Sequence, residues 1–158
     1  MSGLVQAPFD VIVIGLGVHG SSTVRSLAQR GYKVLGLESA PRDSLQHGSS
    51  HGLSRVIRTS YFENPSYVPL VQRSFEMWRD LEFADDAVGS LLTMTGSVMI
   101  GPPACDIVRL TLESLEMHHL QYQVLSAEEM AVKYNNTLRL QPDEVGIFEE
   151  NAGVLYPE

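Results

Sequence analysis

Cysteine and long apolar stretches are nearly absent from this sequence. Its single cysteine, Cys105, cannot form an internal disulfide, which favours a reducing compartment. The longest apolar run, residues 11–16, is far too short to span a bilayer. The N-terminus also lacks the basic segment and apolar core of a secretory signal. We therefore expect an intracellular, soluble protein.

Basic residues are scarce as well. The chain has 11 Lys and Arg against 19 Asp and Glu, which gives a formal net charge of −8. This charge disfavours non-specific binding to nucleic acids or to anionic membranes, so we expect neither as a partner. With 158 residues, of which 44% are hydrophobic, the chain is long enough for one ordinary domain.

Groups of metal-ligating or paired catalytic residues are also lacking. His118 and His119 are adjacent and so face different ways on a helix, and no further ligand is near them. The acidic pairs at residues 128–129 and 149–150 are interpreted as solvated or capping groups. We therefore expect no metal site and no pair of catalytic carboxylates.

The sequence does contain a glycine motif at the end of a strand-like segment. Residues 9–14 are typical of a buried strand and lead into Gly15-x-Gly17-x-x-Gly20. The first glycine allows a tight turn, the second lets backbone approach a pyrophosphate, and the third lets a helix pack close to the strand. The predicted helix, residues 18–30, would direct its free N–H groups and its dipole at phosphates.

An acidic residue ends the next predicted strand. Residues 32–37 have a buried-strand pattern, and Glu38 follows about 20 residues beyond the glycines, where a carboxylate accepts ribose hydroxyls. Strand, turn, helix, strand and acid together predict a dinucleotide site. The pattern leaves NAD and FAD open, whereas the negative charge of Glu38 argues against NADP.

The rest of the chain has a mixed helix and strand pattern. We expect helices over 66–81 and 104–117, a short helix begun by a capping box at 126–129, and strands over 91–100 (bent at Gly96), 122–125, 145–148 and 153–156. The residue pattern changes from helical to strand-like near Asp85, which predicts a boundary between segments 1–85 and 86–158. The fold class is α/β, an incomplete Rossmann-like βαβ unit followed by the first part of an α+β domain. Two parallel strands cannot by themselves form a doubly wound sheet.

A second motif lies in residues 48–58, Gly-Ser-Ser-His-Gly-Leu-Ser-Arg-Val-Ile-Arg. Arg55 and Arg58 are three residues apart, and we expect them on one side of a helical turn. Two cations there would pair with a cofactor ring, a carboxylate substrate or a structural acid. Taken alone, such a pair is also typical of a surface ion-pair site.

With this loop the chain resembles the monomeric sarcosine oxidase family, which includes peroxisomal sarcosine/pipecolate oxidases within the D-amino-acid-oxidase-like flavoproteins. The resemblance covers essentially the whole chain. The matching positions are residues 10–15, Gly17, residues 48–52, Ser54, Arg55, Ile57, Arg58, Tyr61, Tyr67, Trp78, residues 95–96, residues 144–146, Asn151 and residues 153–156.

The resemblance implies FAD as the cofactor. Segment 1–85 would then be the FAD-binding segment, with the pyrophosphate on the turn formed by Gly15, Gly17 and Gly20 and the ribose on Glu38. Segment 86–158 would begin the substrate domain. The activity implied is oxidation of a small secondary amino acid, such as sarcosine or pipecolate, to an imine, with molecular oxygen reduced to hydrogen peroxide.

The resemblance also assigns roles in the second motif. Ser50, His51, Ser54 and Arg55 match positions beside the flavin, and Arg55 would favour negative charge on the ring. Arg58 matches the arginine that holds the substrate carboxylate, for which its fork of donors is suited. His51, Arg55 and Arg58 are therefore the predicted catalytic residues.

Family members continue well beyond this length, so the resemblance implies an N-terminal portion that is inactive when isolated. Cys105 matches no flavin-attachment motif, and the chain ends without a peroxisomal tripeptide, so a peroxisomal location is implied only if the source is eukaryotic. The alternatives are another flavin oxidase of the group, a truncated non-catalytic product, and an NAD-dependent dehydrogenase. The last does not explain residues 51–58.

Overall fold

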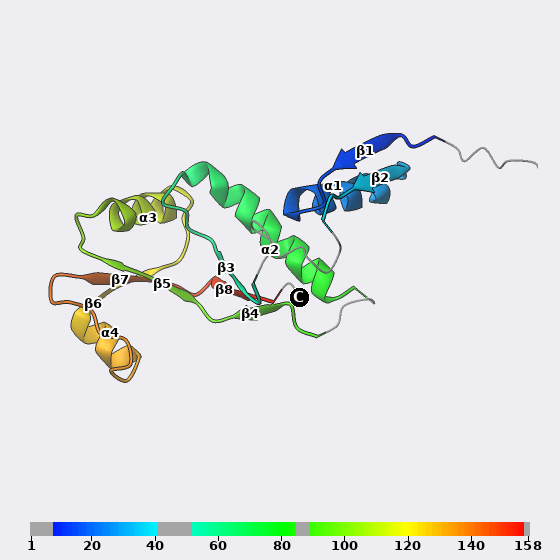
Figure 1. Ribbon diagram of the computed structural model, residues 1–158. Coiled ribbons are helices and arrows are strands. Elements are labelled where there is room, and N and C mark those ends of the chain that lie inside the picture. Colours follow the sequence, from blue (N-terminus) through cyan, green and yellow to red (C-terminus); the bar gives the residue numbers. More distant parts are fainter. Residues whose placement is uncertain (1–7, 41–51, 85–88, 157–158) are drawn as a thin grey trace, which may run out of the picture. The chain divides into compact units, whose positions relative to one another are not determined.

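The structure is a computed structural model and describes residues 8–40, 52–84 and 89–156. The chain divides into two compact units, Met1–Gly52 and Leu53–Glu158 (Figure 1). The functional boundary near residue 85 stays a prediction, and this division of the structure lies elsewhere. In the described ranges, no helix is both long enough and apolar enough to cross a membrane.

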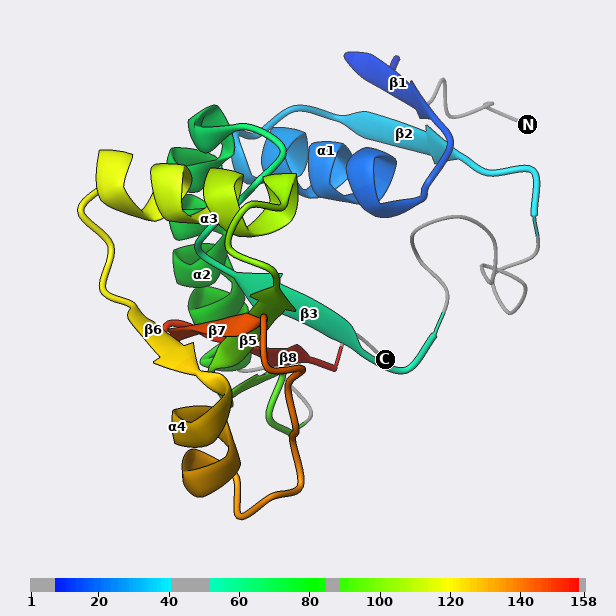
Figure 2. The ribbon, with the colours of Figure 1, turned by 90° about the vertical axis from the view of Figure 1, so that its left-hand side faces the viewer.

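The first unit is the predicted strand–turn–helix–strand unit. It contains β1 (Val11–Ile14), α1 (Val18–Gln29) and β2 (Val34–Leu37), and the two strands pair in parallel with Val11 opposite Val34. The helix packs along this strand pair (Figure 2). Ile12 and Ile14 remain exposed, the latter at 86%. The pair is thus covered by its own helix and still presents apolar side chains to solvent.

The described residues of the second unit, 53–84 and 89–156, form two antiparallel sheets of three strands each. Their orders are β3–β8–β4 and β5–β7–β6. The strands are β3 (Arg55–Arg58), β4 (Leu92–Met94), β5 (Ser97–Gly101), β6 (Gln123–Ser126), β7 (Val145–Glu149) and β8 (Ala152–Leu155). Strands β7 and β8 follow each other directly, so the chain passes from one sheet into the other at residues 150–151.

Each sheet has its own core, and helices pack against both sheets. The helices are η3 (Pro65–Tyr67), α2 (Val68–Glu82), α3 (Asp106–Met117) and α4 (Ala127–Lys133). Phe75 of α2 is buried with Ile57, Leu92 and Leu155 of the first sheet. This core joins strands from both sides of residue 85, which explains why the compact units do not divide there.

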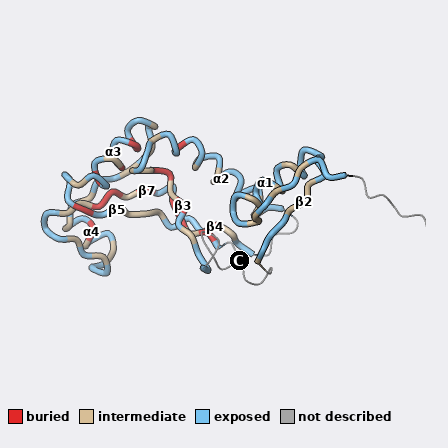
Figure 3. Tube along the Cα trace, turned by 45° about the horizontal axis from the view of Figure 1, so that its top comes forward, coloured by how far each residue is buried: buried red, intermediate tan, exposed pale blue. Residues whose placement is uncertain are grey.

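The second sheet is covered on both faces. Val108 and Leu115 of α3 form a core with Ile147, whereas Met130 of α4 lies against Gly146, where a Cβ would come within 2.8 Å of its sulfur. Neighbouring residues of a strand face opposite sides, so α3 and α4 lie on opposite faces of β7. The buried positions follow this sheet and its helices (Figure 3).

The local sequence signals in this unit are confirmed. Ser126 accepts the backbone N–H of Glu129, and the Glu129 carboxylate accepts the N–H of Ser126, which is the predicted capping box at the start of α4. The predicted bend at Gly96 separates β4 from β5, and this residue has a φ of +70° that favours glycine.

Candidate functional site

The glycine turn between β1 and α1 is constrained by backbone geometry. Gly15 has a φ of +88°, and its N–H donates to the carbonyl of Leu37 at 2.7 Å. A Cβ at Gly20 would overlap the carbonyl oxygen of Gly15 and lie 2.8 Å from its carbon. Both positions therefore require glycine on steric grounds. That the turn contacts a pyrophosphate stays a prediction.

The start of α1 fits an anion. Gly17 is the N-cap residue, and within residues 8–40 no side chain caps this helix and no acid lies in its first turn. The first N–H groups of a helix have no partner within the helix, and the positive end of the dipole lies there. The free N–H groups at the start of α1, beside the tightly packed glycine turn, are the kind of donors that bind a pyrophosphate.

Glu38 follows β2 and turns back to the glycine motif. Its Oε2 accepts the N–H of Leu16 at 2.7 Å, and its Oε1 accepts the N–H groups of Ser39 at 2.8 Å and Ala40 at 3.1 Å. The bond from Leu16, followed by those from Ala40 and Ser39, lowers the pKa of Glu38 below its ordinary value of 4.5. The carboxylate is thus an anion beside the turn, and its contact with a ribose stays a prediction.

Arg55 and Arg58 lie on an extended strand, so the expectation of a helical turn is wrong. Strand β3 pairs antiparallel with β8, with Arg55 opposite Leu155 and Arg58 opposite Ala152. Residues three apart on a strand face opposite sides, so the two arginines do not share a face. The β-branched residues between them favour this conformation, and β8 supplies the hydrogen-bond partners.

Arg58 lies in a cradle made by the three residues Tyr61, Phe62 and Glu63. Its Cζ is 4.9 Å from the ring centroid of Tyr61 and 5.2 Å from that of Phe62. Its Nη2 is 3.4 Å from the Oε1 of Glu63, and the arginine side chain is only 17% exposed. Aromatic faces attract the cation without using its N–H donors, so the rings leave the guanidinium fork to a carboxylate, which in this structure is that of Glu63.

For the other predicted residues of this loop, the structure gives fewer contacts. Ser50 and His51 lie outside the described residues. The carbonyl of Ser54 accepts a bond from the Nη1 of Arg55 at 2.7 Å. The glycine turn with Glu38 and the arginine cradle belong to different units, so the structure assembles two partial sites.

The sequence did not predict the contacts of two acidic residues, Glu63 and Glu149. Glu63 lies five residues after the arginine, a spacing that neither helix nor strand periodicity singles out. Glu149 was expected to be solvated but is only 2% exposed, so that interpretation is wrong. It accepts hydrogen bonds from Thr59 and Ser60, and these donors lie about 90 positions away in the sequence. In the sequence, only the apolar residues that precede Glu149 in its strand indicated its burial.

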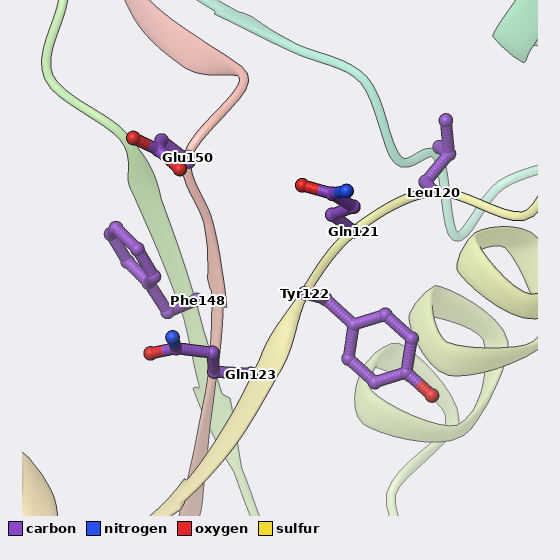
Figure 4. A pocket seen from close by; sticks show the side chains of 6 residues that line it. All are labelled: Leu120, Gln121, Tyr122, Gln123, Phe148 and Glu150. Carbon is purple, nitrogen blue, oxygen red and sulfur yellow. The ribbon is translucent and has the colours of Figure 1, made fainter.

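Two further features carry no predicted site residue. A pocket of about 390 Å³ is lined by Leu120, Gln121, Tyr122, Gln123, Phe148 and Glu150 (Figure 4). Its lining side chains supply amides, a phenol and one carboxylate, and the ammonium of Lys133 donates to the Oε1 of Gln123 at 3.3 Å. Among the described residues, no three His, Cys, Asp or Glu side chains are grouped so as to hold a metal ion.

Comparison with known proteins shows the family to which the chain belongs. The pattern of the family described as FAD dependent oxidoreductase matches residues 10–158. Monomeric sarcosine oxidase from Streptomyces avermitilis is 42% identical over 151 residues, which are 95% of this chain and 38% of that protein. Human peroxisomal sarcosine oxidase is 33% identical over 150 residues, which are 94% of this chain and 37% of that protein.

A solved structure shows the same fold. NikD, described as an unusual amino acid oxidase essential for nikkomycin biosynthesis, superposes with a TM-score of 0.74 at 24% identity, over 94% of this chain and 37% of that one. The chain therefore spans under two fifths of the length of these relatives. The glycine motif alone left NAD and FAD open, and the family match identifies the cofactor as FAD. This chain belongs to the family of FAD-dependent oxidoreductases.

Proposed function

We propose that this chain supplies the FAD-binding turn and the substrate-carboxylate site of an amine oxidase. Its substrate would be a small secondary amino acid such as sarcosine or pipecolate, oxidised to the imine while oxygen is reduced to hydrogen peroxide. The names of the sarcosine oxidase relatives support this substrate class. The FAD-dependent family to which the chain belongs supports the type of reaction.

The observation that carries the proposal is the cradle around Arg58. A guanidinium that is mostly buried, flanked by two rings and paired with one partly exposed carboxylate at 3.4 Å, is arranged to bind an anion. The carboxylate of Glu63 occupies the position that a substrate carboxylate would take. An amino acid would then be oriented by its carboxylate, with its amine-bearing carbon free to react.

The remaining residues would bind and orient the cofactor. The uncapped start of α1 would hold the pyrophosphate and Glu38 the ribose. Ser50, His51, Ser54 and Arg55 would lie along the flavin, where the cation of Arg55 stabilises negative charge on the ring. The chemistry that FAD supplies when bound is acceptance of a hydride and delivery of electrons to oxygen.

A spectrum and a peroxide assay on the protein as its gene encodes it test the proposal. We expect bound flavin, seen as visible absorbance, and peroxide formation with sarcosine or pipecolate exceeding that with D-alanine. Equal or greater turnover of D-alanine would favour another flavin oxidase of the group. Absence of flavin from the purified protein would contradict the proposal.

For residues 1–158 expressed alone, we expect poor flavin retention and no turnover. Within residues 8–40 the unit that carries the glycine turn has two strands, and its side chains Ile12 and Ile14 are exposed. A sheet of two strands is marginally stable in water. A yellow, peroxide-producing 158-residue protein would show that all the required groups lie within these residues.

A further inference from the structure

A buried carboxylate lies behind the arginine cradle. Glu149, the last residue of β7, is 2% exposed. Its Oε2 accepts the hydroxyl of Thr59 at 2.8 Å and the N–H of Ser60 at 2.9 Å, and its Oε1 accepts the hydroxyl of Ser60. Among the described residues it forms no ion pair with Lys, Arg or His. It is thus a buried carboxyl group held by three neutral donors.

These donors occupy a particular place in the chain. Thr59 and Ser60 follow Arg58 directly and precede the two aromatic residues and the acid of its cradle. Both donor residues are buried, and Thr59 also lies 3.3 Å from the carbonyl oxygen of Asn151. The carboxylate is therefore bonded to the two residues that connect Arg58 to the aromatic residues and the acid of its cradle.

Burial of this charge needs an explanation. An ionised carboxylate taken out of water is costly unless its oxygens are hydrogen-bonded, and a well-packed apolar residue often serves stability as well or better. The geometry here satisfies the carboxylate through one short segment, residues 59–60. A charge used in this way sets the position of that segment rather than adding general cohesion.

We propose that Glu149 is a positioning residue for carboxylate binding at Arg58. It holds residues 59–60 so that Tyr61 and Phe62 flank the guanidinium and its donors face the ligand. The inference rests on the proposed function, because it assumes that Arg58 binds the substrate carboxylate. It goes beyond that function by placing the control of this binding on β7, about 90 positions away in the sequence.

The test uses the complete flavoprotein and the variant Glu149→Gln, which keeps the side-chain size and removes the charge. Glu150→Gln is the matched control, because Glu150 is the adjacent carboxylate and is exposed. Binding of acetate and of its neutral isostere acetamide is followed by perturbation of the flavin spectrum. The KM for sarcosine and the limiting rate of flavin reduction are measured in parallel.

We expect Glu149→Gln to weaken acetate binding and raise the KM about tenfold, the effect of one lost hydrogen bond to a charged group. Acetamide binding and the limiting reduction rate should stay within about twofold of the parent, as should every value for Glu150→Gln. In an Arg58→Met background, Glu149→Gln should have no further effect on acetate binding, because coupled residues are non-additive.

Equal losses in acetate binding, acetamide binding and reduction rate would overturn the inference and indicate a purely structural role. So would an effect that persists in the Arg58→Met background. If Glu149→Gln does not fold, Thr59→Val removes one donor with little change of shape and should weaken acetate binding about threefold. Unchanged binding in that variant would also overturn the inference.

A failure of the proposed function gives a different result. If the parent protein binds flavin but acetate does not perturb its spectrum, the assignment of Arg58 fails and this inference falls with it. A further experiment, done without flavin, tests whether Glu149 holds residues 59–60. Amide exchange at Ser60 and Tyr61 should accelerate in Glu149→Gln and not in Glu150→Gln, and equal protection in both would show that the carboxylate does not hold the segment.

Discussion

The carboxylate of Glu38 lies 2.7 Å from the backbone nitrogen of Leu16, so the acid after β2 is bonded to the glycine turn after β1. Two parts of one dinucleotide motif are thereby joined directly, before any ligand is considered. The same carboxylate accepts the N–H groups of Ser39 and Ala40. Its orientation beside the start of α1 is therefore set by backbone, which favours a fixed position for an adenosine ribose.

Replacement of Glu38 by Gln should weaken FAD binding. The amide keeps the shape but removes a charge-assisted acceptor, so we expect a roughly ten- to hundredfold rise in Kd. Recovery of flavin fluorescence on dissociation measures this in the complete protein. Ser39→Ala removes a 3.3 Å hydroxyl contact to the same carboxylate and should leave the Kd unchanged. Equal affinity of Glu38→Gln and the parent would show that this acid does not contact the cofactor.

The lowered pKa of Glu38 predicts a dependence of stability on pH. Because the folded-state pKa lies below 4.5, the stabilisation from its backbone bonds is fully present above that pH and is lost as pH falls through the folded value. The difference in unfolding midpoint between the parent and Glu38→Gln should therefore shrink as the pH is lowered below about 4.5. A difference that is constant from pH 7 to pH 3 would contradict this.

Substitution of Gly20 by Ala should disrupt the turn. The added Cβ would overlap the carbonyl oxygen of Gly15, and since this contact is with backbone, no side-chain movement relieves it. We expect loss of bound flavin, measured as the ratio of visible to protein absorbance. Thr23→Ala, at an exposed position of α1 whose hydroxyl bonds the carbonyl of His19, should retain flavin. Full flavin content in Gly20→Ala would mean that the turn is not the cofactor anchor.

Lysine substitutions of the two arginines should have separate kinetic effects. Arg58→Lys loses the forked donor geometry and should raise the KM for sarcosine, with a smaller change in the limiting reduction rate. Arg55→Lys should alter the rate of flavin reduction, because charge develops on the ring during hydride transfer. Stopped-flow reduction resolves the two quantities. Identical changes in both variants would remove the distinction between their roles.

Removal of the competing carboxylate should strengthen ligand binding. Glu63→Gln leaves Arg58 in its aromatic cradle without an internal anion at 3.4 Å, so a bound carboxylate no longer displaces an ion pair. We expect a two- to fivefold lower Kd for acetate, a small effect because the glutamate is partly exposed and screened. The same substitution at Glu76, which pairs with Arg73 on the exposed side of α2, is the control. Weaker acetate binding in Glu63→Gln would contradict the idea that a bound carboxylate replaces Glu63 at Arg58.

The sequence by itself determined the parts of this protein whose causes are local. The spacing of Gly15, Gly17 and Gly20 between a buried strand and a helix predicted the turn, because steric limits on backbone act over a few residues. The capping box at Ser126 and the bend at Gly96 were predictable for the same reason. Each of these features is confirmed.

Tertiary structure alone decided how the chemical groups are arranged. Arg55 and Arg58 face opposite ways because β8, nearly a hundred residues later, pairs with their strand and keeps it extended. Glu149 is buried because its strand is brought to Thr59 and Ser60 by the same crossing of the chain between sheets. Hydrogen bonds between distant segments leave no periodic trace in either segment. Residue spacing therefore predicted the local turns and caps, and only the pairing of distant strands decided which side chains meet.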